Sequence, residues 1–240
     1  VLPSSDIRVW TMPHPTHALD TANEMRLELA ERVRETFIQS LRPDAVLICS
    51  LCAETEAVTS IGKYTSRIPT ATIFYDLIPW LYRDVYLANE TIERWYLTKL
   101  DDLRRSDLLL SISASSGREA IDYLGFAERQ VVNISTACDD HFRPRALDDE
   151  TKRSLRSTYG LDRPFVMYTG GVDHRKNIEA LIRAFAALPA GLRSQHQLAI
   201  VGKNESHERE LLLKLSLQYG LPPGDLVLTD YIPDDDLVSL

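Results

Sequence analysis

Apolar residues recur along the chain in two alternating patterns. Short continuous apolar runs, several of them rich in β-branched residues, are typical of strands buried in a parallel sheet. They lie at 7–10, 44–49, 69–76, 108–113, 131–134, 165–168, 198–201 and 227–229. Longer stretches in which apolar residues return every three or four positions predict helices with one buried face. These cover 21–41, 54–61, 91–105, 116–124, 178–188 and 206–219.

The alternation of strands and helices predicts an α/β fold in which right-handed βαβ units build parallel sheets. A polar, charge-rich connection from Asp139 to about Thr151 interrupts the pattern. Domain boundaries commonly fall in such connections. We therefore predict two Rossmann-like domains, residues 1–145 and 146–240.

Two helices carry signals for their ends. Thr21 with Glu24 and Ser116 with Glu119 fit capping boxes, and Gly125 is placed to end the second helix. In the first helix, apolar side chains at four-residue spacing are predicted to face the core. They are Met25, Leu29, Val33, Phe37 and Leu41.

The stretch 165–188 combines a strand, a glycine turn, a basic pair and a helix. Gly170 and Gly171 free the backbone to turn sharply after the strand. The helix begins near Asn177, where its first N–H groups lack internal partners and its dipole is positive. With Arg175 and Lys176 beside it, this turn is predicted to bind an anion such as a phosphate.

A simpler interpretation of the same turn stays open. Asp173 or Asn177 could serve only to cap a helix, and the basic pair could be solvated. A glycine pair alone is weak evidence for a ligand site.

A second candidate site follows the strand at 69–76. Ligands of parallel sheets meet the carboxyl ends of the strands, so Tyr75 and Asp76 are positioned to contact a substrate. The alternative is that Asp76 only caps the turn that follows.

Composition excludes some classes of protein. With 240 residues, 44% of them hydrophobic, the chain can bury a substantial core. A formal net charge of −8 argues against a nucleic-acid-binding protein, which needs a basic surface. No apolar run approaches the roughly 20 residues that span a bilayer, and no signal-peptide pattern is present. We therefore expect a cytoplasmic chain.

The cysteines and histidines give little support for redox or metal chemistry. Cys49 and Cys52 have C-x-x-C spacing, but no second pair completes a zinc set. We expect reduced cysteines that pack in the interior, with redox chemistry as the alternative. His14 and His17 lie in a proline-bearing loop without further ligands nearby. We expect no bound metal and no cofactor.

The string YTGGVDHRKNIEALIRAF resembles the donor-binding turn of retaining GT-B glycosyltransferases, a group that includes bacterial mannosyltransferases of surface-polysaccharide assembly. ATIFYDLIPWLY, DLLLSISASSGREAIDYLG and VVNISTACDDHFRP resemble elements of the acceptor-side domain and the linker, in the family's order. LAIVGKN and LVLTDYIPDDDLVSL resemble the next strands of the donor domain. The resemblance covers about 44–240.

The resemblance implies roles for particular residues. It implies catalytic roles for Asp76, Arg175 and Lys176, and substrate contacts for Tyr75 and Asp76. It also implies a set of donor-binding positions. That set is Gly170, Gly171, Arg175, Lys176, Gly202, Tyr231 and Ile232.

The sequence departs from the family pattern in three ways. Tyr75 stands where many relatives have a histidine, and Gly171 stands where other branches have an arginine. The family's acidic E-x₇-E stretch is expected after Leu240, and its first strand and glycine loop before Val1. Both domains are therefore expected to be incomplete, and the chain by itself inactive.

The function implied is transfer of a hexosyl group, with retention, from a nucleotide-diphosphate sugar to an acceptor hydroxyl. GDP-mannose is the first expectation for the donor, and a glycan or polyprenyl-linked glycan for the acceptor. Peripheral membrane association at the inner face is a further option. Tyr75–Asp76 and Gly170–Lys176 are expected to face one cleft.

Two other functions stay open. One is a nucleotide-sugar epimerase of the same double-Rossmann architecture, and the other is a protein that binds nucleotide sugars without catalysis. A dinucleotide-binding protein is disfavoured because the sequence lacks G-x-G-x-x-G.

Overall fold

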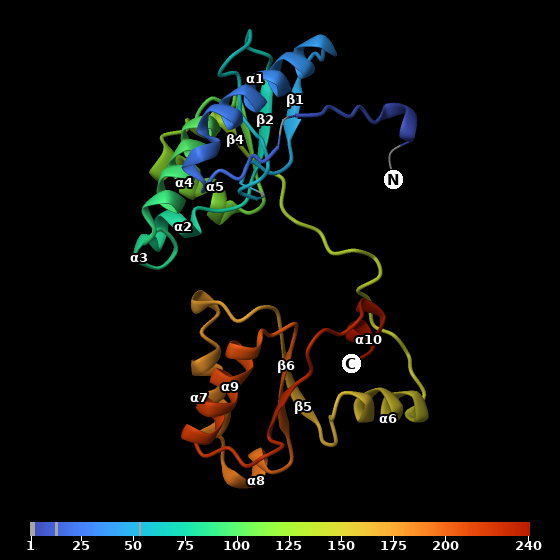
Figure 1. Ribbon diagram of the computed structural model, residues 1–240. Coiled ribbons are helices and arrows are strands. Elements are labelled where there is room, and N and C mark those ends of the chain that lie inside the picture. Colours follow the sequence, from blue (N-terminus) through green and yellow to red (C-terminus); the bar gives the residue numbers. More distant parts are fainter. Residues whose placement is uncertain (1–2, 13, 53) are drawn as a thin grey trace. The chain divides into compact units, whose positions relative to one another are not determined.

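The computed structural model describes residues 3–12, 14–52 and 54–240. The chain forms two compact units, Val1–Ala137 and Cys138–Leu240. Each unit contains its own parallel β-sheet with helices packed against it (Figure 1). The predicted α/β class is therefore confirmed.

The sheet of the first unit has the strand order β1-β2-β3-β4, and every neighbouring pair is parallel. Its strands are β1 (Val46–Ile48), β2 (Thr70–Phe74), β3 (Leu108–Ser111) and β4 (Val131–Asn133). Each lies within a stretch predicted to be a strand. In β2 the residues alternate between buried and half-buried, because successive side chains point to opposite faces of the sheet.

The helices of the first unit are α1 (Glu24–Ser40), α2 (Ile78–Leu81), α3 (Arg83–Tyr86), α4 (Glu90–Leu103) and α5 (Ala114–Leu124). Short 3₁₀ turns lie at Ser4–Asp6, Thr21–Asn23 and Glu128–Gln130. The core includes Leu77, Leu109 and Leu100.

The ends of α5 are fixed by local hydrogen bonds. Ser113 and Ser116 form the capping box at its start, so the helix begins earlier than the predicted pairing of Ser116 with Glu119. Gly125 ends it in the left-handed conformation, at φ 77°, as predicted.

The second unit has a three-stranded parallel sheet in the order β5-β6-β7. Its strands are β5 (Phe165–Thr169), β6 (Gln197–Val201) and β7 (Leu226–Leu228). Its helices are α6 (Asp149–Thr158), α7 (Ile178–Ala186), α8 (Ala190–Arg193), α9 (Ser206–Gln218) and α10 (Asp234–Ser239), with a 3₁₀ turn at His174–Lys176.

Strand β6 is buried along its whole length because apolar clusters cover both of its faces. On one face α7 and α9 lie side by side and contribute Ile182 and Leu212 to the core (Figure 1). On the other face Leu161 and Ile232 pack against Val201. The apolar run at 198–201 thus predicted a buried strand correctly, and this strand lies at the centre of the sheet.

Two predicted elements are wrong. Residues 7–10 form no strand, and residues 54–61 form turns and extended chain instead of a helix. Ile7 and Val9 are exposed, so this apolar run has no sheet to join among the described residues. At the end of the 54–61 stretch, the Glu35 carboxylate of α1 accepts hydrogen bonds from the Ser60 hydroxyl and from backbone N–H groups at residues 63–65. These bonds hold residues 60–65 as a loop.

The position of α1 is as predicted, but its predicted buried face is wrong. Met25 is 86% exposed and Leu29 is 50% exposed, whereas Ala30, Glu31 and Glu35 are buried. The predicted capping box is also not formed, because Asp20 caps the short turn that precedes the helix.

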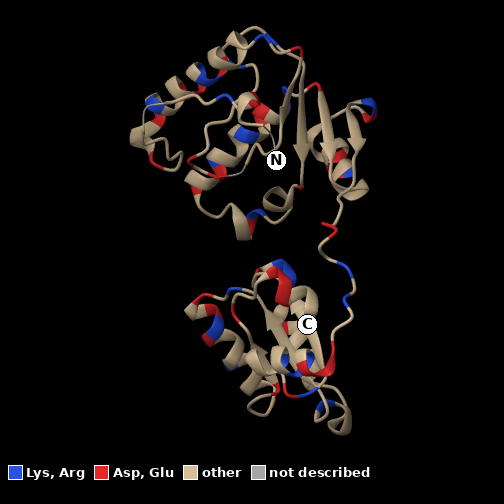
Figure 2. Cartoon of the chain, turned by 90° about the vertical axis from the view of Figure 1, so that its right-hand side faces the viewer, with Lys and Arg blue, Asp and Glu red and all other residues tan. Residues whose placement is uncertain are grey.

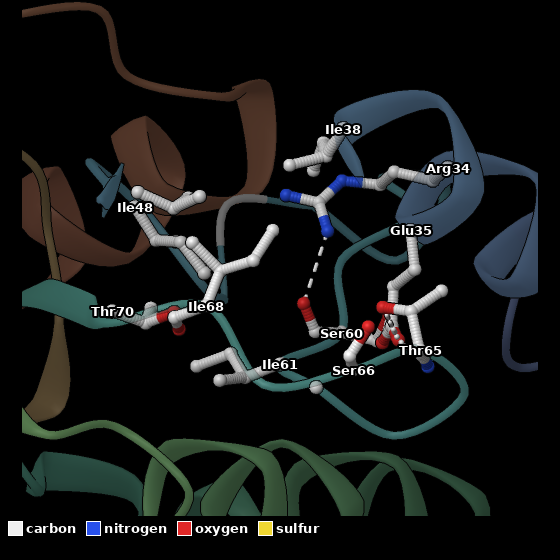
Figure 3. Close-up of a pocket in the computed structure, with 12 residues that line it drawn as sticks. Arg34, Glu35, Ile38, Ile48, Ser60, Ile61, Thr65, Ser66, Ile68 and Thr70 are labelled. Carbon is white, nitrogen blue, oxygen red and sulfur yellow. Dashed lines mark hydrogen bonds between the residues drawn. The ribbon is translucent and has the colours of Figure 1, made fainter. Parts of the chain in front are cut away.

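Glu35 explains which face of α1 is buried. Its carboxylate accepts hydrogen bonds from the Ser60 hydroxyl at 2.6 Å and from the backbone N–H groups of Lys63, Tyr64 and Thr65 at 3.0, 2.8 and 3.1 Å. The Thr65 hydroxyl adds a further bond. Figure 3 shows Glu35 directed at Thr65, and Arg34 of the same helix bonded to the Ser60 carbonyl oxygen. These bonds fix α1 to the loop through polar residues.

Charged residues of both signs are interspersed along both units (Figure 2). None of the helices within the described residues is long and apolar enough to cross a membrane.

Candidate functional site

A cavity of about 380 Å³ lies at the carboxyl ends of β1 and β2 in the first unit. Its apolar wall is formed by Leu51, Ile73, Phe74, Pro79, Leu100 and Leu103. Its polar lining is formed by Ser50, Cys52, Tyr75, Asp76, Tyr96 and Lys99. We call this cavity the β1–β2 pocket. It is the place where an α/β sheet presents a ligand.

Tyr75 and Asp76 are the predicted site residues that line this pocket. The Tyr75 side chain is 51% exposed, and Asp76 is also exposed. Asp76 Oδ1 accepts a hydrogen bond from the Ile78 N–H at 2.9 Å, so the carboxylate caps the turn that follows β2. A carboxylate has two oxygens and can accept several bonds, so this cap does not prevent Asp76 from binding a hydroxyl as well.

Glu119 of α5 stabilises the same turn and was not among the predicted site residues. Its Oε2 accepts a hydrogen bond from the N–H of the fully buried Leu77 at 3.0 Å. The turn after Asp76 is therefore fixed from two sides.

Charged groups are buried below the pocket. The Lys99 side chain is almost fully buried, and its Nζ donates to the Thr59 carbonyl oxygen at 2.5 Å. Glu31 Oε1 lies 3.9 Å and Asp102 Oδ2 4.0 Å from the same Nζ. Burial lowers the pKa of Lys99 and raises the pKa of Asp102 to about 6. The positive charge of Lys99 is thus already balanced inside the protein.

Tyr96 is the other buried polar residue of the pocket. It is only 5% exposed, and its hydroxyl makes no hydrogen bond within geometric limits to any described residue. Burial raises the pKa of this phenol, so it stays protonated, while the nearby Trp80 N–H has a smaller, opposing effect on that pKa. The Tyr96 hydroxyl oxygen is therefore enclosed by the protein, close to the Trp80 N–H.

The cysteine prediction is partly wrong. Cys49 and Cys52 are free, but both residues are exposed and do not pack in the core. Although Cys52 as a whole is exposed, desolvation of its thiol in the pocket raises the pKa to about 11. A thiol with that pKa is a poor nucleophile at neutral pH.

In the second unit, Gly170 and Gly202 follow β5 and β6 and contact each other. Both have positive φ, 132° and 151°. The Gly170 N–H donates to the Val201 carbonyl oxygen at 3.1 Å, and a Cβ on Gly202 would lie 2.8 Å from the Gly170 carbonyl oxygen. Gly171 faces open space, and its carbonyl oxygen accepts a bond from the Tyr168 hydroxyl at 3.0 Å. The backbone of this turn is therefore held in place yet accessible.

The basic pair follows in the turn His174–Lys176. Asp173 accepts a hydrogen bond from the Arg175 N–H at 3.0 Å, and its Oδ1 lies 3.4 Å from Arg175 Nε. The Lys176 ammonium forms no ion pair or hydrogen bond with any described residue, and the side chains of Arg175 and Lys176 are both exposed. Asn177 adopts a left-handed conformation without a side-chain cap, and α7 begins at the next residue.

The capping alternative therefore holds for one residue of this turn and fails for another. Asp173 caps the 3₁₀ turn, but the Asn177 side chain caps nothing at the start of α7. The order of glycine turn, basic pair and helix start is as the sequence predicted. Whether an anion binds there stays a prediction.

The remaining predicted donor contacts lie after β7. Tyr231 is 71% exposed, whereas Ile232 is buried in the core and can offer a ligand only its backbone. Sequence reasoning missed Asn204, whose amide donates to the Gly202 carbonyl oxygen at 2.9 Å while its buried Oδ1 has no partner among the described residues.

Within the described residues, no group of three or more His, Cys, Asp or Glu side chains is placed to hold a metal ion. The β1–β2 pocket and the Gly170–Lys176 turn belong to different units, so the expected common cleft stays a prediction.

Comparison with known proteins identifies the relatives of the chain. Residues 151–240 match the family model described as "Glycosyl transferases group 1". The "Serotype-specific mannosyltransferase WbdA" of Escherichia coli is 30% identical over 242 residues, a match that covers all of this chain and 30% of that protein. The chain thus spans about a third of the length of this relative.

Solved structures agree on the fold. HepE of Anabaena, in complex with UDP-glucose, has a TM-score of 0.64 at 18% identity and matches 88% of this chain and 54% of its own. A "putative UDP-N-acetylglucosamine 2-epimerase" of Listeria monocytogenes has a TM-score of 0.52 at 11% identity, over 89% and 52%. Residues 151–240 are therefore similar to the group 1 glycosyltransferases, and the chain has the two parallel α/β units of the GT-B fold.

Proposed function

We propose that the protein containing this chain transfers a hexosyl group, first of all mannosyl, from a nucleotide-diphosphate sugar to a glycan or polyprenyl-linked glycan. The observation that carries the proposal is the turn at 170–177, with two accessible glycines, Arg175 beside Asp173, a Lys176 ammonium that pairs with none of the described residues and the start of α7. The name of the E. coli relative supports mannosyl transfer, and we take GDP-mannose as the donor.

The turn suits the group that leaves in such a reaction. As the bond from the anomeric carbon to the diphosphate oxygen breaks, negative charge develops on the diphosphate. Positioned N–H groups and cations stabilise that charge more in the transition state than in the bound donor. In the proposed complex, Gly170, Gly171 and the first N–H groups of α7 bind phosphate oxygens, and Arg175 and Lys176 supply positive charge.

We further propose that the transfer proceeds with retention. The acceptor oxygen attacks the anomeric carbon on the face from which the diphosphate departs, and the proton of the acceptor hydroxyl passes to the departing phosphate oxygen. Asp76 and Tyr75 contact the substrate from the β1–β2 pocket. This scheme uses no metal and no cofactor. We place the reaction in the cytoplasm, at the inner face of the membrane where the acceptor is polyprenyl-linked.

Two alternatives remain. Because a putative epimerase shares the fold, the fold by itself does not decide between transfer and epimerisation. A binding protein without activity is the other, since Tyr75 replaces a histidine that many relatives have.

One experiment separates these functions. The protein is incubated with GDP-mannose and an octyl α-mannoside acceptor, and the products are analysed by mass spectrometry and by NMR of the anomeric proton. An elongated α-linked product supports retaining transfer. Free epimerised sugar supports the epimerase, and intact donor after prolonged incubation supports binding alone.

A further inference from the structure

We propose that Glu119 of α5 is a positioning residue of the reaction. By accepting the Leu77 N–H it holds Asp76 at the β1–β2 pocket, where Asp76 contacts the substrate. This inference rests on the proposed function. It gives a role in the reaction to a residue outside the pocket lining, on a helix that follows Asp76 by about 40 residues in the chain.

The first observation is the partner of the Leu77 N–H. β2 ends at Phe74, whose carbonyl oxygen accepts the Ile112 N–H at 3.1 Å, and Leu77 lies beyond these strand ends. Its side chain is fully buried. Glu119 Oε2, 42 positions further along the chain, accepts the Leu77 N–H at 3.0 Å. Because a buried N–H without a partner is costly, the placement of this peptide group depends on Glu119.

The second observation is that Asp76 and Leu77 share that peptide group. The peptide is planar and trans, so an N–H directed at Glu119 also fixes the direction of the Asp76 carbonyl group. The Asp76 carboxylate in turn accepts the Ile78 N–H at 2.9 Å. Two successive N–H groups held by two carboxylates restrict the turn to the arrangement in which Asp76 lines the pocket.

The third observation is the firm placement of α5. Ser113 and Ser116 form the capping box at its start. Gly117 lies so close to β3 that an added Cβ would be 2.9 Å from Ser111 Oγ. Glu119 is half-buried on this helix, so its carboxylate is presented from a rigid element. Such support matters because a displacement of about 1 Å at a substrate contact can reduce the rate about 100-fold.

The test is a double-mutant cycle of Glu119→Met and Asp76→Ala in the protein that contains this chain, with GDP-mannose as donor and octyl α-mannoside as acceptor. Methionine has a similar length but no carboxylate oxygen to accept the Leu77 N–H. Glu119→Met should lower kcat/KM about tenfold, and Asp76→Ala about 100-fold. The double variant should match Asp76→Ala within about twofold, because Glu119 acts through Asp76.

A purely structural role of Glu119 predicts a different result. Loss of stability would reduce the folded fraction with or without Asp76, so the two losses would multiply to about 1,000-fold. That result, or an unchanged kcat/KM for Glu119→Met, would overturn the proposal.

Three further variants make the cycle specific. Glu119→Gln retains an acceptor oxygen and should keep kcat/KM within about threefold of the wild type. Glu128→Met, at an exposed position in the 3₁₀ turn after α5, is the matched control and should equal the wild type. If Glu119→Met does not fold, Glu119→Asp replaces it, since the shorter side chain withdraws the carboxylate from the Leu77 N–H.

Amide hydrogen exchange separates this inference from the proposed function, because it needs neither donor nor acceptor. The Ile78 N–H, which donates to Asp76, should exchange about tenfold faster in Glu119→Met than in the wild type, while the amides of β3 should exchange at the same rate. If Ile78 responds in this way but the wild type transfers no sugar, Glu119 positions Asp76 and the transferase proposal fails. If the exchange of Ile78 is unchanged, the positioning proposal is wrong whether or not sugar is transferred.

Discussion

Gly202 approaches Gly170 so closely that a Cβ atom on Gly202 would lie 2.8 Å from the Gly170 carbonyl oxygen. The two residues follow neighbouring parallel strands and both have positive φ. The glycine turn of the proposed donor site is thus supported directly by the backbone of the next turn. Position 202 therefore requires glycine for both its conformation and the space around it.

Gly202→Ala should destabilise the protein by about 2–3 kcal/mol, because alanine is strained at this φ and displaces the Gly170 turn. Urea unfolding measures the change. Gly191→Ala is the control, since that glycine lies in α8 with no atom within 4 Å of an added Cβ, and it should be neutral or stabilising. Equal stability of the two variants would show that the close approach is unimportant.

Glu35→Gln should cost about 2–4 kcal/mol at pH 7, since an amide NH₂ would face donors that now bond to a carboxylate oxygen. Glu28→Gln, which alters an exposed i,i+4 pair with Arg32 on the same helix, should cost about 0.5 kcal/mol or less. The measurement is the free energy of unfolding in urea.

The effect of Glu35 should also depend on pH. Burial acts to raise the pKa of Glu35, but hydrogen bonds from Ser60, Tyr64, Lys63 and Thr65 outweigh it and hold the pKa below its ordinary value of 4.5. The stability that this carboxylate contributes is therefore present above about pH 4.5 and is lost as the pH falls further. A constant difference between wild type and Glu35→Gln from pH 7 to pH 3 would contradict this account.

Asp102 should show the opposite dependence. Burial raises its pKa from 3.8 to about 6, so the folded chain retains a proton that the unfolded chain releases across that window. Its contribution to stability therefore falls as the pH rises from about 4 to 6. Asp102→Asn should be about 2 kcal/mol more stable than the wild type at pH 7.5 and nearly equal to it at pH 4.

Thermal or urea unfolding of Asp102→Asn across this pH range provides the measurement. A variant that is less stable than the wild type at pH 7.5 would mean that attraction to Lys99, 4.0 Å away, outweighs the cost of burying the carboxylate.

The sequence predicted best where local pattern decides the structure. The apolar run at 165–168 and the glycines after it specify a strand and a turn by themselves, and β5 and Gly170 are found there. The start of α7 after Asn177 follows from the same local pattern. The donor-side candidate could therefore be located from sequence alone.

The buried face of α1 could not be predicted in this way. Met25, Leu29 and Val33 have the spacing of a core stripe, but the helix is oriented by the bonds from Glu35 to a loop 25 to 30 residues further along the chain. Helical spacing identifies an apolar face without saying what packs on it. Hydrogen bonds between residues far apart in the sequence therefore determine which face of α1 is buried.

The contribution of α4 to the β1–β2 pocket was missed for a related reason. The apolar positions of α4 predicted a helix with one buried face, and its polar residues Tyr96, Lys99 and Asp102 were not singled out, although Tyr96 and Lys99 line the pocket. These three residues lie three positions apart, so they share one face of the helix, and that face is buried. A row of polar residues among the core positions of a helix is the signal that could have indicated the site.

The central claim is that the turn at 170–177 binds the departing diphosphate, and Arg175→Ala tests it most directly. In the protein that contains this chain, kcat/KM for GDP-mannose should fall about 100-fold or more, roughly 2.7 kcal/mol of transition-state stabilisation, and Lys176→Ala should behave similarly. Arg183→Ala, at an exposed position further along α7, is the control and should match the wild type. If Arg175→Ala and Lys176→Ala both retain wild-type kcat and donor KM, the turn does not bind the diphosphate and the account is wrong.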